Sequence, residues 1–83
     1  MIEVKQLEYL EMPQGVEEFF LVRQNEEGLI IMEWYQKYDE EWFSNLIHNF
    51  TNRTPYDETK VLEEVELSVP GVTTLFVEEG TFY

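Results

Sequence analysis

The segment Glu33–Phe43, EWYQKYDEEWF, holds five aromatic rings and four carboxylates in eleven residues. It links the two elements that decide the predicted fold, an apolar strand ending near Tyr35 and an amphipathic helix beginning at Asp39. Asp39 suits a helix N-cap, and Glu40 and Glu41 suit the positive end of the helix dipole. Helical spacing then places one set of apolar side chains on a single face: Trp42, Phe43, Leu46, Ile47 and Phe50.

This helix is predicted to bury Trp42 and Phe43 in the core, and to leave Tyr35 and Tyr38 exposed at the junction with the strand. Its outer face is polar but uncharged, and it comprises Ser44, Asn45, His48 and Asn49. A neutral face indicates either contact with a partner or packing under the C-terminal segment, and the sequence does not distinguish the two.

A β-hairpin precedes the helix. Val16–Gln24 is rich in β-forming residues, and Asn25–Gly28 forms a loop in which Gly28 can take a positive φ. The return strand, Leu29–Tyr35, is apolar on both faces, with Leu29 and Ile31 on one and with Ile30, Met32 and Trp34 on the other. A strand of this kind lies centrally and needs cover on both sides.

The two ends of the chain complete the predicted sheet. Ile2–Met12 fits a strand better than a short helix, although both interpretations stay open. Thr54 and Pro55 could start a short second helix. The alternation of Val61, Val65, Leu67 and Val69 then predicts a strand, which Pro70–Gly71 connects to a further strand, Val72–Gly80. Whether residues 55–64 are helix or strand stays open.

The predicted fold is therefore a small α+β domain spanning residues 1–83, with a mostly antiparallel sheet of four or five strands. It contains two hairpins and one main α-helix on one face. A single helix covers a single face, so we expect the second apolar face to associate with a partner or with a second copy of the chain.

Length and composition limit the classes of protein. Eighty-three residues without cysteine make one domain whose thin core has no disulfide support. The N-terminal segment lacks the pattern of a signal peptide, and no apolar run approaches the roughly 20 residues that span a bilayer. The expected location is the cytoplasm.

The charge is unusual, because 18 acidic residues face five Lys and Arg for a net charge of −13. Eleven acids lie between Glu3 and Glu41, seven between Asp57 and Glu79, and none between Trp42 and Tyr56. Phosphate backbones are bound by basic residues, so we expect no direct binding of nucleic acid. The hydrophobic content of 43% argues against disorder.

No motif of catalysis, metal binding or cofactor binding is found. His48 is the single histidine and has no basic or cysteine partner nearby in the sequence. Adjacent glutamates point to opposite faces of a strand and do not converge as an acid–base pair. The sequence therefore predicts a protein that is not an enzyme and that needs no cofactor.

Rows of carboxylates can imitate the phosphates of nucleic acid. Same-face residues of a strand are about 6.6 Å apart, close to the phosphate spacing along a DNA strand. Glu64 and Glu66 share a face if their segment is a strand, and Glu3, Glu17 and Glu18 add further acids. Tight binding also needs aromatic anchors. The predicted rim that combines acids and rings consists of Tyr35, Tyr38, Asp39, Glu40 and Glu41.

In size, charge, aromatic content and lack of cysteine, the chain resembles the class of small acidic inhibitors made by bacteriophages, which includes anti-CRISPR proteins, uracil-DNA glycosylase inhibitors and other DNA mimics. The resemblance implies an inhibitor that blocks the basic groove of a nucleic-acid-binding protein such as a CRISPR effector, a DNA-repair or restriction enzyme, or a nuclease. Two alternatives stay open. One is an immunity protein or antitoxin that neutralises a basic nuclease toxin, and the other is an assembly subunit whose charge serves solubility.

Overall fold

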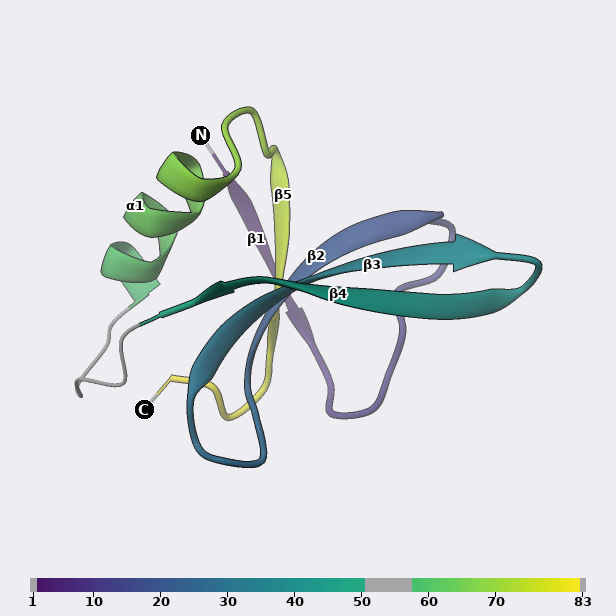
Figure 1. Cartoon of the computed structure of the whole chain (residues 1–83), viewed down its shortest axis with the longest axis horizontal. Helices are drawn as coiled ribbons and strands as arrows, with labels where there is room; N and C mark the ends of the chain where they lie inside the picture. The colour runs from purple at the N-terminus through teal and green to yellow at the C-terminus, as the bar shows by residue number, and fades with distance from the viewer. Residues whose placement is uncertain (1, 51–57, 83) are drawn as a thin grey trace.

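The computed structural model describes residues 2–50 and 58–82 and has the predicted α+β architecture. One helix packs on a sheet whose strand order is β1-β5-β2-β3-β4 (Figure 1). The elements are β1 (Glu3–Leu7), β2 (Glu18–Gln24), β3 (Ile30–Tyr38), β4 (Glu41–Asn49), α1 (Glu58–Ser68) and β5 (Thr74–Glu78).

The sheet is mixed, with the antiparallel pairs forming its larger part. Strands β2, β3 and β4 follow one another as an antiparallel meander. After α1 the chain returns as β5, which lies between β1 and β2 and runs parallel to both. This leaves β1 and β4 as the two edges of the sheet.

The predicted hairpin formed by β2 and β3 is confirmed, and its loop shows why these residues turn. The side-chain Oδ1 of Asn25 accepts hydrogen bonds from the backbone N–H groups of Glu27 and Leu29, both at 2.9 Å. Gly28 takes a φ of +84°, a conformation that glycine adopts without steric cost. Strand β3 lies between β2 and β4 as the pattern of its apolar residues predicted.

The predicted helix beginning at Asp39 is wrong, because Glu41–Asn49 forms strand β4. Asp39 is not an N-cap: it and Glu40 have φ values of +50° and +67° and make a two-residue hairpin turn with β3. The apolar spacing was helical, but most residues of the segment are aromatic, β-branched or small and polar, types that favour strands or disfavour helices. Of the two rings predicted to be buried, Phe43 is exposed and Trp42 is partly buried. Among the other apolar residues of the segment, Phe50 is buried, whereas Leu46 and Ile47 are exposed.

The predicted strand in Val61–Val69 is also wrong, because Glu58–Ser68 forms helix α1. Val61 and Val65 are four residues apart and almost fully buried, and the N–H of Val69 bonds to the carbonyl of Val65 in helical fashion. Alternation would have placed the charged Glu63 in the core, which a helix avoids. The predicted helix start at Thr54 and Pro55 lies outside the described residues.

The two faces of the sheet carry separate apolar clusters. On the face under α1, a buried core unites residues from β2, β3, α1 and β5 with Phe50, which follows β4: Val22, Ile30, Met32, Phe50, Val61, Val65, Leu75 and Val77. The opposite face has a smaller cluster built on Leu7, Phe19 and Leu21, against which Tyr35, Trp42 and Phe76 pack. The one helix of the described chain leaves this second face, here called the open face, without helical cover. Leu7, Phe19 and Leu21 are nevertheless at most 7% exposed, because other side chains of the same chain cover them. The expected association through this face therefore stays a prediction.

Candidate functional site

The tip of the β3–β4 hairpin is the most acidic projection of the molecule. Asp39 and Glu40 form the turn and Glu41 begins β4, and all three side chains are exposed. Aspartate tolerates the left-handed backbone region of such turns. The hairpin therefore presents three consecutive carboxylates at the end of two long strands (Figure 1).

Two further predicted acids, Glu17 and Glu18, lie near the same end of the sheet. The N–H of Lys37 donates to the carbonyl of Glu17 at 2.9 Å, and Glu18 pairs with Gln36 across the β2–β3 ladder. Residues far apart in the sequence are thus gathered at one end of the fold. Below, the term acidic tip means Glu17, Glu18, Asp39, Glu40 and Glu41.

Lys37 offsets part of this negative charge. Its Nζ lies 3.6 Å from Oε2 of Glu40 and 5.7 Å from the centroid of the Trp42 ring. Because the carboxylate of Glu40 is 92% exposed, this ion pair contributes little to stability. It leaves the acidic tip with a clear excess of negative charge that is available to a partner.

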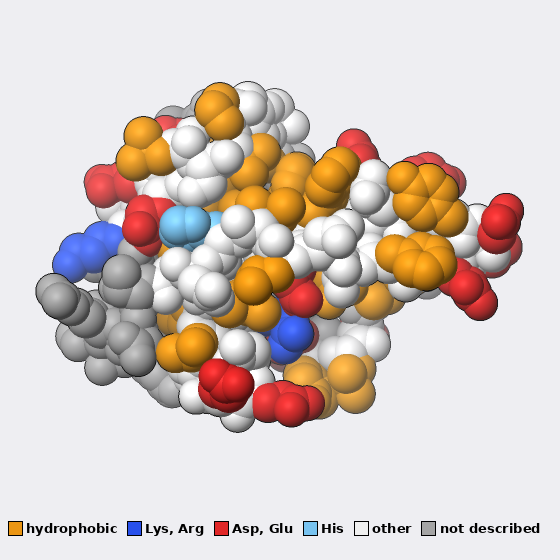
Figure 2. Space-filling view, in the orientation of Figure 1, with side chains coloured by type: hydrophobic (Ala, Val, Ile, Leu, Met, Phe, Trp, Pro, Cys, Tyr) orange, Lys and Arg blue, Asp and Glu red, His pale blue; other side chains and the backbone are white. Residues whose placement is uncertain are grey.

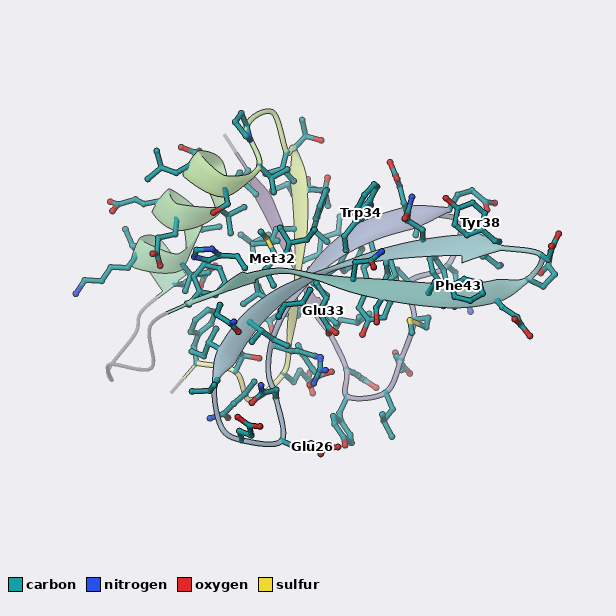
Figure 3. The ribbon with its side chains drawn as sticks, viewed as in Figure 1. Glu26, Met32, Glu33, Trp34, Tyr38 and Phe43 are labelled. Atoms are coloured by element: carbon teal, nitrogen blue, oxygen red, sulfur yellow. The ribbon has the colours of Figure 1, made fainter. Side chains whose placement is uncertain are left out.

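Two aromatic rings accompany the acidic tip. Tyr38 is 57% exposed and Phe43 is 51% exposed, and their ring centroids are 6.1 Å apart. Gln36 donates from Nε2 to the Tyr38 hydroxyl at 3.1 Å, which helps to orient this ring. Figure 3 shows the two rings side by side near the end of the hairpin, and Figure 2 shows acidic side chains around them. Exposed rings beside carboxylates are the combination expected of an interface anchor.

Tyr35 does not belong to this rim, although the sequence predicted it there. Its ring stacks on Phe19 with a centroid distance of 4.8 Å, and its hydroxyl donates to Oε1 of Glu33 at 3.2 Å. Burial, followed by the nearby Glu33 carboxylate, raises the pKa of Tyr35 above its usual value. Tyr35 therefore packs into the apolar cluster on the open face of the sheet.

The sequence analysis missed a polar cluster on this open face. Glu33 is almost buried, and its Oε1 also accepts a hydrogen bond from Nε of Arg23. This hydrogen bond is the main reason that the pKa of Arg23 is raised. Glu78 lies near the same pair, and burial raises its pKa above 4.5. The signal was available, because Glu33 is the one charged residue within the apolar run of β3.

A cavity of about 520 Å³ adjoins this polar cluster. The segment from Tyr9 to Met12 forms one wall, and the opposite side comes from β2, β3 and β5 through Leu21, Arg23, Tyr35 and Glu78. Arg23 and Tyr35 direct their polar atoms to Glu33, so these groups already satisfy one another. The three side chains therefore form one hydrogen-bonded network beside the cavity.

Glu64 and Glu66 do not form a row on a strand, because both lie on α1. Residues two apart on a helix point in different directions. Glu66 is exposed, while Glu64 Oε1 lies 3.8 Å from Nε2 of His48. His48 was expected to be exposed on a helix, but it lies on β4 and packs edge-on against Phe50. The strand-spaced imitation of phosphates by Glu64 and Glu66 is therefore excluded.

Within residues 2–50 and 58–82, no group of three or more His, Cys, Asp or Glu residues is arranged to hold a metal ion. None of the described helices is long and apolar enough to cross a membrane. A scan against protein-family models, a search of curated proteins and a search of solved structures each found no match.

Proposed function

We propose that the protein is a non-enzymatic inhibitor that inserts its acidic tip into the basic groove of a nucleic-acid-binding protein. The observation that supports this proposal is that the exposed rings of Tyr38 and Phe43 lie together beside the carboxylates of the acidic tip. Carboxylates steer a basic partner into place, and buried rings then supply most of the binding energy. The net charge of −13 extends this attraction over the whole molecule.

The carboxylates of the tip act as a cluster on a narrow projection rather than as a regular row. Asp39 and Glu40 occupy the hairpin turn and Glu41 begins β4, so the three side chains are not held together at the spacing of strand residues. A projection of this shape suits a concave basic groove. A CRISPR effector, a DNA-repair enzyme or a restriction enzyme offers a groove of this kind.

The clustering favours a second candidate, an immunity protein or antitoxin that covers the active site of a basic nuclease toxin. The same tip would serve there, because a nuclease site also binds phosphate. The two candidates differ in the target and not in the binding chemistry. Relief of nuclease toxicity by co-expression in cells would assign the second.

The test is affinity capture from nuclease-treated bacterial lysate with the immobilised full chain, followed by identification of the captured proteins. We expect proteins with basic nucleic-acid-binding grooves, released by double-stranded DNA and by rising salt. The chain alone should not shift DNA in a mobility assay. The double substitution Glu40→Lys and Glu41→Lys should slow association with the purified target at least about tenfold, because steering depends on these charges.

A matched control keeps this test specific. Glu63→Lys with Glu66→Lys makes the same change of net charge at two exposed positions of α1. This control should retain most of the association rate. Equal rates for wild type, tip variant and helix variant, together with indifference to salt, would rule out electrostatic inhibition and leave solubility as the role of the acids.

A further inference from the structure

The outer edge of β4 is the least protected strand edge of the described sheet. Seven of its nine residues are exposed, with Trp42 and His48 partly covered. An edge strand offers free backbone N–H and C=O groups to another strand. Proteins commonly blunt such edges with charges, prolines or short strands, and β1 follows this rule with five residues that include Glu3 and Lys5.

Strand β4 lacks these protections over most of its length. From Trp42 to Asn49 it contains neither a charged residue, counting His48 as neutral, nor a proline. A bulge is present, but it lies opposite the Met32–Glu33 step, between the partners Leu46 and His48. The segment Trp42–Leu46 therefore remains a regular strand that is open to pairing.

The hydrogen-bond ladder shows which backbone groups of β4 have no strand partner among residues 2–50 and 58–82. Lys37 directs its N–H to Glu17 on the β2 side. Because directions alternate along a strand, Tyr38, Gln36 and Trp34 direct theirs to β4 and bond with Glu41, Phe43 and Asn45. The remaining residues of the regular part, Trp42, Ser44 and Leu46, direct their backbone groups to the open edge.

We infer that this edge pairs antiparallel with the same edge of a second copy, which gives a twofold dimer with a continuous sheet. A twofold axis at Ser44 places Ser44 opposite itself and Trp42 opposite Leu46 of the second copy. All three outward-facing residues then meet outward-facing partners. Leu46, which is 55% exposed, gains apolar cover in this arrangement.

The lack of charge on this edge, together with its self-complementary antiparallel register, favours a second copy as the occupant. A chain with a net charge of −13 repels its own copies, and the segment of β4 from Trp42 to Asn49 offers them an approach free of acids. The antiparallel register holds the two Glu41 residues about 20 Å apart along the strands, well beyond the Debye length of about 8 Å. A basic partner gains nothing from a neutral strand and is drawn to the acidic tip instead. The dimer would carry two acidic tips pointing in opposite directions.

Sedimentation of the full chain over a concentration series tests the dimer. We expect weak, reversible dimerisation that strengthens as salt screens the repulsion. The proposed inhibitor complex responds oppositely, because salt weakens attraction to a basic partner. The two proposals can therefore fail separately. A monomer at all concentrations up to about 1 mM in 0.5 M salt would overturn the dimer.

Two variants and one matched control locate the interface. Ser44→Lys places like charges at the axis, and Ser44→Pro removes a free N–H, so each should weaken dimerisation at least about tenfold. Ser68→Lys adds the same charge at an exposed position of α1 and should leave dimerisation unchanged. Dimerisation that is equally strong in all three variants would place the interface elsewhere and refute the proposal.

Amide hydrogen exchange in the wild-type protein gives a readout that does not depend on the folding of any variant. The N–H groups of Trp42, Ser44 and Leu46 should exchange rapidly in dilute protein and slowly in concentrated protein. Those of Phe43 and Asn45 should be protected at both concentrations because they bond to β3. Equal, fast exchange at the three outward positions in a concentrated dimer would contradict edge pairing.

Discussion

The helix-covered region and the β3–β4 hairpin contain similar apolar residues but differ in how far they expose them to solvent. Under α1, the side chains of Met32, Val65 and Leu75 have no solvent exposure. Along β4, Phe43 and Leu46 are more than half exposed. The comparison teaches that similar apolar side chains are buried where a second layer covers them and stay exposed along the edge strand β4.

Truncation of one buried and one exposed side chain should show the largest contrast. Met32→Ala removes a fully buried side chain from the core beneath α1 and should lower the free energy of unfolding by about 2–5 kcal/mol. Leu46→Ala on the exposed strand should lower it by less than about 0.5 kcal/mol. Urea denaturation followed by tryptophan fluorescence measures both. Similar losses in the two variants would remove the distinction between the core and the open edge.

The sequence predicted the part of the fold in which local signals agree. The Asn25–Gly28 loop, the two-faced apolar pattern of β3 and the strand near the C-terminus all indicate the same structure. In the hairpin β2–β3, turn residues and strand patterns support each other, and the prediction is confirmed. The fold class follows from these elements and from the presence of one helix.

The prediction failed where apolar spacing disagreed with residue type. In Glu41–Asn49 the spacing was helical and the residues favoured strands, whereas in Glu58–Ser68 the spacing alternated and the residues favoured a helix. Residue type decided both segments. Asp39 and Glu40 were acceptable as a helix start or as a tight turn, and the pairing of β4 with β3 selected the turn.

Only part of the candidate site was predicted, because local patterns indicate which residues face water but not which distant residues come together. Asp39, Glu40 and Glu41 are exposed as expected, since acids in a turn or at a helix start both face water. Their proximity to Glu17 and Glu18 depends on the β2–β3 register, which local patterns do not give. Glu64 and Glu66 were displaced by the helix. Whether these residues bind a partner stays a prediction.

Two tyrosines of β3 compare a partly buried with an exposed hydroxyl, and the expected losses in the free energy of unfolding are smaller. Tyr35→Phe removes the hydroxyl that donates to the nearly buried Glu33 and should lower the free energy of unfolding by about 1 kcal/mol. Tyr38→Phe changes an exposed hydroxyl and should have little effect on stability. Thermal or urea unfolding of both variants measures the difference. A larger loss for Tyr38→Phe would mean that the acidic tip and not the open face carries the structural network.

The pH dependence of stability provides the smallest effect, and it arises at Glu78. Burial raises the pKa of this carboxyl in the folded protein above its usual value of 4.5, with the neighbouring Glu33 adding to the rise and Arg23 opposing it. Between the unfolded and the folded pKa, the folded state therefore binds more protons than the unfolded state. The contribution of Glu78 to stability is highest below the unfolded pKa and falls as pH rises through the folded pKa.

At neutral pH the ionised carboxylate of Glu78 is thus a small burden on the folded state, and Glu78→Gln should raise the unfolding midpoint. Glu79→Gln removes the same charge from the adjacent exposed position and controls for the general relief of self-repulsion. The gain of Glu78→Gln over this control should be present at pH 7 and should shrink as pH falls toward 4, since wild-type Glu78 then becomes protonated. Urea midpoints measured from pH 4 to pH 8 show the difference. If Glu78→Gln and Glu79→Gln raise the urea midpoint equally at every pH, the surroundings of Glu78 do not disfavour its charge. The carboxylate of Glu78 beside Arg23 would then be as well solvated as those of the acidic tip.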